Sequence, residues 1–326
     1  MRQNELADSC MNRTVSRREL LRLAGVASVM PWLPRISLAE AAAAAVTEIA
    51  QGIYVHTARH AVVSVTNSGD IANSTFIVGR EAVAVIDTGS TFRIGKSLKS
   101  AVQAVTPRPV RYVINTHMHP DHVFGNAAFE GDAPTFIAHH KMARGLAARA
   151  ETFLRRYEEQ IGAEAFAGTK VVYPTQAVTD RTTIDLGDRT LELVARATAH
   201  TDNDLTVRDG ATETLLLGDL LFSGHVPTLD GSILGWLKLI GELKAESAAR
   251  VVPGHGPASM TWPDAIVPVE RYLSVIVKDV RALIKDGKTL SEATEIAGRS
   301  ERDAWQIFDE HHVRNVTAAF AELEWE

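Results

Sequence analysis

The stretch THMHPDHVFGN, residues 116–126, constrains this chain most, because it places three histidines and an aspartate within six positions. It continues the apolar run VRYVINT (110–116), which is typical of a buried strand. At a strand end, residues two apart point to the same side, and Pro120 forces a turn that brings the remaining side chains toward the same space. The sequence therefore predicts one cavity with four candidate metal ligands: His117, His119, Asp121 and His122.

Three further candidate ligands stand at the ends of later β-type runs. His200 follows LELVARAT, Asp219 lies in LLLGDLLF, and His255 lies between two glycines in VVPGHGP. These glycines let the backbone pass close to a crowded site without Cβ clashes. Imidazole and carboxylate groups bind Zn²⁺, and the first stretch alone exceeds what one catalytic zinc with an open position needs. The surplus predicts a second metal.

Strand and helix patterns follow one another in the order of a layered α/β protein. The expected strands are 52–57, 62–65, 74–79, 82–89, 110–116, a pair within 182–198, a pair within 205–222, and 250–256. The expected helices are 92–105, about 139–167, 263–287, one opened by the capping box Thr289-Leu290-Ser291-Glu292, and the amphipathic end of the chain. A single domain is expected over residues 42–326.

The composition limits both the partners and the metal ligands. The chain has 326 residues, 45% of them hydrophobic and 23% charged, with a formal net charge of -6. These values are typical of a water-soluble globular protein and offer no basic patch for nucleic acid. Cys10 is the only cysteine and precedes the expected mature chain. Any metal must therefore be held by nitrogen and oxygen.

Residues 1–41 have the order of an export signal, with a basic start, a short apolar middle and small residues at the end. Arg17 and Arg18 ahead of the apolar run resemble a twin-arginine signal. Ala39-Glu40-Ala41 is a candidate cleavage site. The alternative is a membrane anchor, but the apolar run is interrupted and shorter than the ~20 residues that span a bilayer. We therefore expect a periplasmic protein with no membrane span after cleavage.

Taken together, H-x-H-x-D-H (117–122), a later histidine, G-D-x-x-F (218–222) and G-H-G (254–256) resemble the motifs of the metallo-β-lactamase superfamily of binuclear zinc hydrolases. The resemblance covers nearly the whole chain after the signal. It implies an α/β fold, an αββα sandwich with the metals at one edge between the sheets, here with a helical C-terminal region. It also implies two Zn²⁺ per chain. The first would be held by His117, His119 and His200, the second by Asp121, His122 and His255, and Asp219 would bridge both.

The resemblance implies a mechanism as well. Two zinc ions that share a water lower its pKa, direct the hydroxide at a carbonyl or phosphoryl centre, and stabilise the developing oxyanion. Asp121 is the expected catalytic residue, because a carboxylate that binds metal through one oxygen can accept a hydrogen bond from the nucleophile or relay its proton. Asp87, in VIDTG, is expected to orient ligating imidazoles.

Two features narrow the reaction. One large subclass of true metallo-β-lactamases uses a cysteine at the second metal, whereas an aspartate there is similar to glyoxalase II-type thioesterases. A thioesterase, esterase or lactonase is therefore expected ahead of a β-lactamase. The segment LLFSGHVPTLDGSILGWL (220–237), with the export signal and the ending AFAELEWE, resembles the exported zinc metallohydrolases of quinoprotein relay systems, which are SoxH-like. This resemblance implies a small-molecule substrate and a periplasmic quinoprotein partner.

Asp230 and Trp236 lie in that segment and are expected substrate contacts; the alternative is a turn aspartate and a core tryptophan. Two other functional classes are open. Flavodiiron redox enzymes share the fold but replace the second histidine of the motif by an acidic residue, so His119 argues against them. A non-catalytic metal-binding periplasmic module would usually have lost ligands, and none is missing from the motif.

Overall fold

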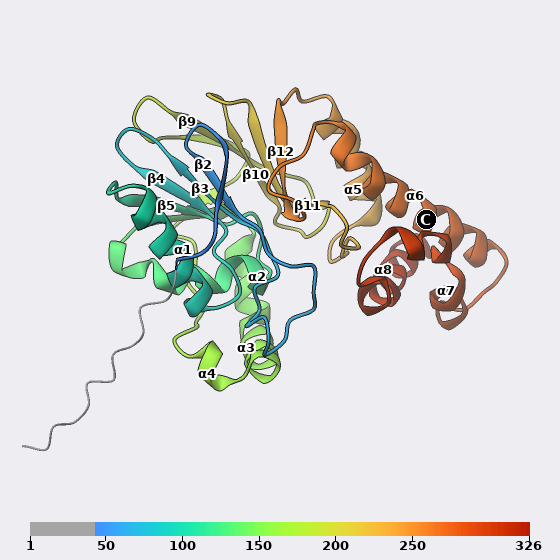
Figure 1. Cartoon of the computed structure of the whole chain (residues 1–326). Helices are drawn as coiled ribbons and strands as arrows, with labels where there is room; N and C mark the ends of the chain where they lie inside the picture. Colours follow the sequence, from blue (N-terminus) through green and yellow to red (C-terminus); the bar gives the residue numbers. More distant parts are fainter. Residues whose placement is uncertain (1–42) are drawn as a thin grey trace, which may run out of the picture. The chain divides into compact units, whose positions relative to one another are not determined.

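The structure, a computed structural model, describes residues 43–326 and folds them into two β-sheets with helices against the outer face of each (Figure 1). The expected export signal and Cys10 lie outside the described residues. Within the strands, apolar residues alternate, as in Ile53 and Val55, and the buried faces of the two sheets share one core. The expected α/β sandwich with a helical C-terminal region is confirmed.

The first sheet has seven strands in the order β1-β2-β3-β4-β5-β6-β7. Neighbours are antiparallel from β1 to β4 and parallel from β4 to β7. The strands are β1 (Thr47–Ala50), β2 (Ile53–His56), β3 (Ser74–Val78), β4 (Val83–Ile86), β5 (Val110–Ile114), β6 (Thr135–His139) and β7 (Gln176–Val178). Because β4 and β5 are parallel, the polar residues that follow them, Asp87 and Asn115, meet at one edge of the sheet.

The second sheet has five strands in the order β12-β11-β10-β9-β8. All neighbours are antiparallel except β11 and β12, which are parallel. The strands are β8 (Arg181–Asp185), β9 (Thr190–Ala195), β10 (Leu205–Asp209), β11 (Thr214–Phe222) and β12 (Arg250–His255). Every residue of β11 is buried, because the strand lies inside the sheet and both of its faces are covered.

The helices are α1 (Phe92–Val105), α2 (Pro120–Val123), α3 (Met142–Ile161), α4 (Ala163–Phe166), α5 (Ile233–Lys244), α6 (Val267–Lys285), α7 (Leu290–Ile296) and α8 (Phe308–Leu323). The expected capping box opens α7: the Thr289 hydroxyl accepts the N–H of Glu292, and the Glu292 carboxylate accepts the N–H of Thr289. Among the described residues, no helix is long and apolar enough to cross a membrane.

Three layers of apolar contacts hold the sandwich together. Between the sheets, Ile77 and Ile114 of the first sheet share a core with Leu193 of the second. Helix α1 covers the outer face of the first sheet, and α5, α6 and α8 cover the outer face of the second. Each fully buried isoleucine or leucine side chain stabilises the fold by about 1.5–3 kcal/mol. The two sheets are therefore a rigid frame for the side chains at their edges.

The prediction of one strand is wrong. Residues 62–65 form no strand but belong to an irregular loop, 57–73. Asn67 closes this loop: its side-chain oxygen accepts the N–H groups of Ser64 and Gly69, and its side-chain N–H₂ donates to the carbonyl of Val62 at 2.8 Å. An asparagine that binds the backbone locally competes with strand pairing, and this explains the difference.

A helix was also missed. No helix is expected from the sequence between residues 167 and 263, but α5 begins at Ile233. Ser232 caps it by accepting the N–H of Gly235 at 2.8 Å. The single expected helix at about 139–167 is instead the end of β6 followed by α3 and α4.

Candidate metal centre

The first four candidate ligands follow β5, at the edge where the parallel strands end. Pro120 occupies the start of α2, a position where its ring fits and its missing N–H costs nothing. The turn places Asp121 and His122 on α2, directly after His119 in extended backbone. All of these side chains are buried or half-buried. The local sequence therefore directs four candidate ligands toward the same site.

The other three candidates reach the same place from the second sheet. Asp219 lies in β11, His255 ends β12, and His200 follows β9. The seven residues form two groups, in each of which the potential ligand atoms lie within 4.8 Å of one another. The first group is His117, His119, His200 and Asp219; the second is Asp121, His122 and His255. The structure thus brings together all seven residues that the sequence singled out.

Two glycines permit this crowding. A Cβ atom on Gly254 would lie 2.0 Å from Asp219 Oδ1. A Cβ atom on Gly218, whose φ is +52°, would lie 2.6 Å from the side chain of Thr116. Both distances are far shorter than any real contact, so a larger residue at either position would displace the site.

In the second group, each imidazole has one nitrogen bound to a protein acceptor. His122 Nδ1 donates to Asp87 Oδ2 at 2.8 Å, and His255 Nδ1 donates to the carbonyl oxygen of Ile71 at 2.7 Å. Carbonyl and carboxylate oxygens only accept, so Nδ1 carries a proton, and Nε2 offers a lone pair once the ring is neutral. Asp87 therefore lies where it can orient an imidazole, as its place after β4 indicates.

The first group repeats this arrangement with other acceptors. His200 Nδ1 donates to the carbonyl oxygen of Thr228 at 2.6 Å. His119 is turned the other way, with Nε2 donating to Asp230 Oδ2 at 3.0 Å. The free lone pairs are therefore Nε2 of His200 and Nδ1 of His119.

His117 is oriented through a relay. The Thr116 hydroxyl donates to Asp87 Oδ2 at 2.7 Å, so its oxygen is left to accept from His117 Nδ1 at 3.0 Å. Nε2 of His117 is then free. Asp87 therefore fixes two imidazoles, one directly and one through a hydroxyl.

The free nitrogens surround one carboxylate. Distances from the carboxylate oxygens of Asp219 are 3.2 Å to Nε2 of His122, 3.4 Å to Nε2 of His255, 3.5 Å to Nε2 of His200 and 3.7 Å to Nε2 of His117. Asp219 is thus the only one of the seven side chains that faces both groups at these distances.

Several of these buried atoms have no partner. His117 Nε2, His122 Nε2 and Asp219 Oδ1 make no hydrogen bond within the described chain. His119 Nδ1 and His200 Nε2, both lone pairs in the tautomers argued above, lie only 3.0 Å apart. Each unsatisfied buried polar atom costs about 1–3 kcal/mol. Divalent cations would satisfy all of them, and a set of imidazoles and carboxylates without thiolate suits zinc and its neighbours.

Carboxylates dominate the electrostatics of the second group. Burial lowers the pKa of His255, but the charge of Asp219 and the hydrogen bonds to both aspartates outweigh it and raise the pKa to about 9. Burial is likewise outweighed at His122, where Asp219, Asp121 and Asp87 raise the pKa well above its usual value. The second group therefore attracts positive charge, which a proton or a metal ion can supply.

Burial dominates the first group. It lowers the pKa of His200 to about 3 and the pKa of His117 well below its usual value, and the neighbouring imidazoles act in the same direction. Both rings are therefore neutral near pH 7 and offer a lone pair without first losing a proton.

Asp230 is bound by three cationic or donor groups. His119 contacts its Oδ2, Arg149 of α3 binds both oxygens, and Arg314 of α8 donates to Oδ1 at 2.8 Å. Burial raises the pKa of Asp230, but hydrogen bonds from His119 and Arg149 outweigh it and hold the pKa below its usual value. The carboxylate is thus an ionised acceptor that orients His119 and does not line the metal pocket, where a substrate contact was expected.

For Trp236 the expected substrate contact is wrong, and the alternative, a core tryptophan, is what the structure shows. Its side chain is 0% exposed, and its indole N–H donates to the carbonyl oxygen of Leu220 at 3.3 Å. The ring packs edge to face at 5.5 Å from His200 and belongs to the core beneath the second sheet. Trp236 is thus a core residue of α5 that packs against His200 of the first group.

A pocket of about 350 Å³ opens over the candidate centre and is called the metal pocket below. Its walls come from the 57–73 loop, from α3 and from α8 as well as from the ligands. The lining residues are Ala61, Val62, Val63, Ile71, His119, Pro120, Asp121, Phe153, Arg156, Tyr157, Gln160, Asp219, Phe222, His225, Thr228, His255, Glu310, His311 and Arg314. The candidate ligands are thus accessible to a small molecule.

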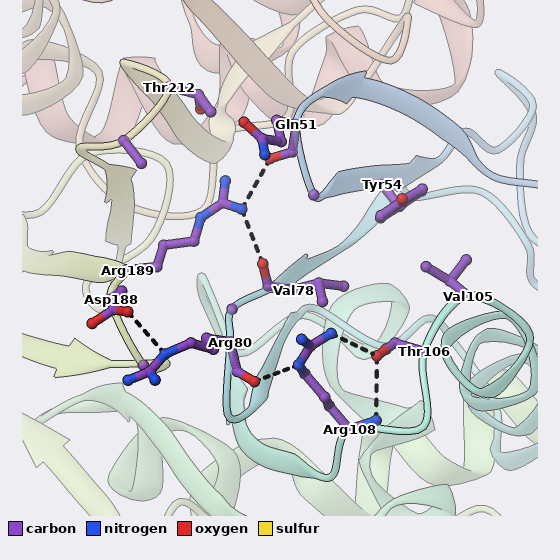
Figure 2. Close-up of a pocket in the computed structure, with 14 residues that line it drawn as sticks. Gln51, Tyr54, Val78, Arg80, Val105, Thr106, Arg108, Asp188, Arg189 and Thr212 are labelled. Carbon is purple, nitrogen blue, oxygen red and sulfur yellow. Dashed lines mark hydrogen bonds and ion pairs between the residues drawn. The ribbon is translucent and has the colours of Figure 1, made fainter.

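A second hollow, of about 520 Å³, is lined by Arg80, Arg108 and Arg189 and is called the arginine hollow (Figure 2). Arg189 binds both oxygens of Asp209 at 2.9 Å and two backbone carbonyls of neighbouring turns. Arg108 donates to the carbonyl oxygen of Arg80, and Arg80 pairs with Asp188. These guanidinium groups join turns of the two sheets, so the hollow is a structural junction.

Several residues of the site had no sequence signal. Arg149 and Arg314 both form ion pairs with Asp230. Their helices are far apart in the chain, so no local spacing in the sequence predicts these contacts. His225 and His311 line the metal pocket, although neither has the spacing of a ligand motif. For the residues on α3, the only usable sequence signal was helical periodicity, because residues three, four and seven positions apart lie on the same face of a helix.

Comparisons with known proteins agree with this geometry. A family model described as the metallo-beta-lactamase superfamily matches residues 67–255. All seven candidate ligands lie within that span. A curated relative, the Beta-lactamase-like protein 2 homolog of Caenorhabditis elegans, is 27% identical over 229 residues, which is 68% of this chain and 68% of its own.

Solved structures share the fold. A metallo-beta-lactamase from Pontibacter korlensis has a TM-score of 0.58 at 20% identity and covers 71% of this chain and 98% of its own. The protein TMB-1 has a TM-score of 0.56 at 18% identity and covers 71% and 97%. A variant of the sec-alkyl sulfatase PisA1 has a TM-score of 0.61 at 14% identity and covers 77% and 45%. At these identities the likeness shows the fold alone.

Proposed function

Because the chain belongs to the metallo-beta-lactamase superfamily, we propose that it is a hydrolase that uses two zinc ions to cleave an ester, thioester or related bond. One observation carries the proposal. Five imidazoles each have one nitrogen bound to a protein acceptor and the other turned into a shared site beside Asp219. Such orientation is typical of metal-ligating histidines.

The residues divide into two sets of ligands. His117, His119 and His200 would hold one zinc, Asp121, His122 and His255 the other, and Asp219 would bind both. When bound, the pair of ions supplies Lewis acidity and activates water near neutral pH.

Asp121 is the proposed catalytic residue. Burial raises its pKa, but His122 and His255 outweigh this and hold the pKa well below its usual value, so the carboxylate is ionised at neutral pH. An ionised carboxylate at the wall of the metal pocket can accept a hydrogen bond from the nucleophile and so orient it. Tyr157 lies beside it, and burial together with the charge of Asp121 raises the pKa of this phenol well above its usual value. Tyr157 therefore stays protonated and can donate a hydrogen bond.

The ligand set supports an ester-like or thioester bond ahead of a β-lactam. The described chain offers Asp219 where one large subclass of β-lactamases has a cysteine ligand, and the sequence resembles glyoxalase II-type thioesterases in this respect. A lactonase is the alternative within the same chemistry. The names of the solved neighbours include a metallo-beta-lactamase and a sec-alkyl sulfatase, so β-lactam and sulfate-ester bonds both belong in the test.

We further propose that the chain is exported through a twin-arginine signal and acts in the periplasm. The order of charges and apolar residues before residue 42 supports this proposal. Changing Arg17 and Arg18 together to lysine should retain the protein in the cytoplasm, measured by cell fractionation. Arg13→Lys is the matched control, and normal export of the double variant would contradict the signal.

The resemblance to SoxH-like quinoprotein relay hydrolases supports a periplasmic quinoprotein partner. Co-purification of a pyrroloquinoline-quinone-dependent dehydrogenase with the tagged chain from a periplasmic extract is the expected result. Recovery of the hydrolase alone, under conditions where both proteins are present, would contradict this part of the proposal.

The enzyme itself is tested with the purified full chain. We expect two bound metals per chain under zinc-replete conditions and hydrolysis of at least one substrate among esters, thioesters and lactones. β-Lactam, phosphodiester and sulfate-ester substrates complete the panel and identify a different bond class. Fewer than one metal per chain together with no hydrolysis of any substrate would overturn the proposal.

A further inference from the structure

One face of helix α3 forms a wall of the metal pocket. Phe153, Arg156, Tyr157 and Gln160 all line it, and their spacing of three, four and seven residues places them along one helical stripe. Tyr157 lies beside Asp121, close to the candidate ligands. Arg156 and Gln160, which are exposed, therefore stand at the rim, beside the path by which a small molecule enters.

The guanidinium of Arg156 is uncommitted. Arg314, the other arginine of the pocket, donates to Asp230. Arg156 makes no hydrogen bond or ion pair with any residue that the structure describes. Asp121 and Asp219 belong to the candidate centre, so Arg156 and Glu310 are the remaining charged groups of the walls.

Glu310 has a structural explanation that Arg156 lacks. It lies in the first turn of α8, where the helix dipole favours a carboxylate. Arg156 lies inside α3, and its free guanidinium presents several N–H donors to the pocket. The charge that remains available for a ligand is therefore positive.

The same pocket also has an apolar part. Ala61, Val62 and Val63 of the 57–73 loop line the pocket together with Ile71 and Phe153. Val62 is 44% exposed, so part of this apolar lining is open to a ligand. A ligand that combines an apolar chain with an anionic group would match both features.

We propose that the metal pocket selects substrates whose acyl part is an apolar chain ending in an anionic group, such as a carboxylate, and that Arg156 binds this group. The inference rests on the proposed hydrolase function and adds the substrate class. Arginine suits the role because its planar fork can bind both oxygens of a carboxylate, and such charge-assisted hydrogen bonds are among the strong ones. The apolar chain would lie against the 57–73 loop and Phe153.

The chain provides a matched control for the test. Arg155 is also exposed and carries the same charge on the same helix, but it does not line the pocket. The substrates are the mono-para-nitrophenyl ester of glutarate, whose far end is a carboxylate, and the same ester with that carboxylate capped by methyl. We expect the wild type to have a KM about tenfold lower for the anionic ester. Arg156→Gln should abolish the difference, and Arg155→Gln should keep it.

A binding measurement keeps this inference separate from the proposed function. Calorimetric titration of the zinc-loaded full chain with glutarate and with monomethyl glutarate needs no turnover. We expect glutarate to bind about tenfold more tightly, with the difference lost in Arg156→Gln alone. If no ester is cleaved but this pattern holds, the hydrolase proposal fails and the anion site stands.

Two outcomes would overturn the inference. The first is a wild type that shows no preference for the anionic ester or for glutarate, or equal effects of the two arginine variants. The second is a preference for a cationic aminoacyl ester that disappears in Glu310→Gln, which would assign selection to the opposite wall.

Discussion

The candidate metal centre and the arginine hollow both gather charged side chains at the ends of strands, but they satisfy them differently. Strand β4 begins beside Arg80 of the arginine hollow and ends beside Asp87 of the metal centre. In the hollow, Arg189 is bound by a buried carboxylate and two carbonyls of the chain itself. At the metal centre, buried nitrogen and oxygen atoms have no partner within the described residues.

This difference separates a structural junction from a site that needs a ligand. A buried polar group that the protein satisfies contributes to stability, whereas one left unpaired costs about 1–3 kcal/mol unless something binds there. The arginine hollow is the larger of the two, yet its arginines are already occupied. Unpaired buried atoms are therefore a better guide to function here than the size of a cavity.

Replacing Asp219 by asparagine should produce the largest effect, because this carboxylate faces four imidazoles. We expect kcat/KM to fall at least about 1,000-fold, since metal-ion catalysis supplies several kcal/mol. Elemental analysis should show less metal per chain. Asp202→Asn, in the loop after His200, is the control and should change neither quantity. A variant at Asp219 that kept both metals and full activity would refute the assigned role.

Arg189→Ala should affect stability alone. It leaves Asp209, which is 0% exposed, as a buried unpaired carboxylate, and breaking such a pair costs about 3–5 kcal/mol. Denaturant unfolding measures this loss, with metal content expected to stay unchanged. Arg80→Gln, whose side chain is 61% exposed, is the control and should cost about 0–1 kcal/mol. If Arg189→Ala lost metal but kept its stability, the distinction between the arginine hollow and the candidate metal centre would be refuted.

Asp230→Asn should weaken metal binding without preventing it. The change removes the charged acceptor that orients His119, and loss of such a partner typically costs about 10–100-fold in metal affinity. A competition titration with a chelator measures the effect. If metal affinity were unchanged and only KM rose, Asp230 would be a substrate contact, as the sequence first suggested.

Acidification should affect the two ligand groups unequally. The metal-free protein has a pKa of about 9 at His255, so below this pH a metal must displace a proton, and affinity falls by up to about tenfold per pH unit. The pKa of about 3 at His200 means that no proton competes at this ligand between pH 6 and 8. Metal titrations at pH 8 and at pH 6 should show that the affinity of the site that includes His255 falls on acidification. The affinity of the site that includes His200 should change much less. Equal dependence at both sites would contradict the electrostatic difference.

The sequence predicted where the candidate ligands lie better than it predicted the residues that support them. His117 to His122 follow a buried strand and a proline, so local geometry alone turns them inward. Asp87 could be anticipated in the same way, because it ends the neighbouring strand. The positions of these side chains could be predicted because each depends on one strand and the turn after it.

The supports depend on tertiary packing and could not be predicted. Asp230 lies in a segment that looked like a substrate loop, but arginines from α3 and α8 draw it onto His119. Trp236 is in the same segment, and the unpredicted helix α5 buries it.

The strand expected at 62–65 is absent for a local reason, because the side chain of Asn67 closes a loop there.

The most direct test of a two-metal centre is an equilibrium zinc titration of the metal-free full chain and of two variants, His200→Ala and His255→Ala, one from each ligand group. We predict two equivalents bound by the wild type and the loss of one equivalent in each variant, with the remaining site differing between them in affinity and pH dependence. A wild type that binds a single equivalent, or two variants that lose the same site, would contradict the account.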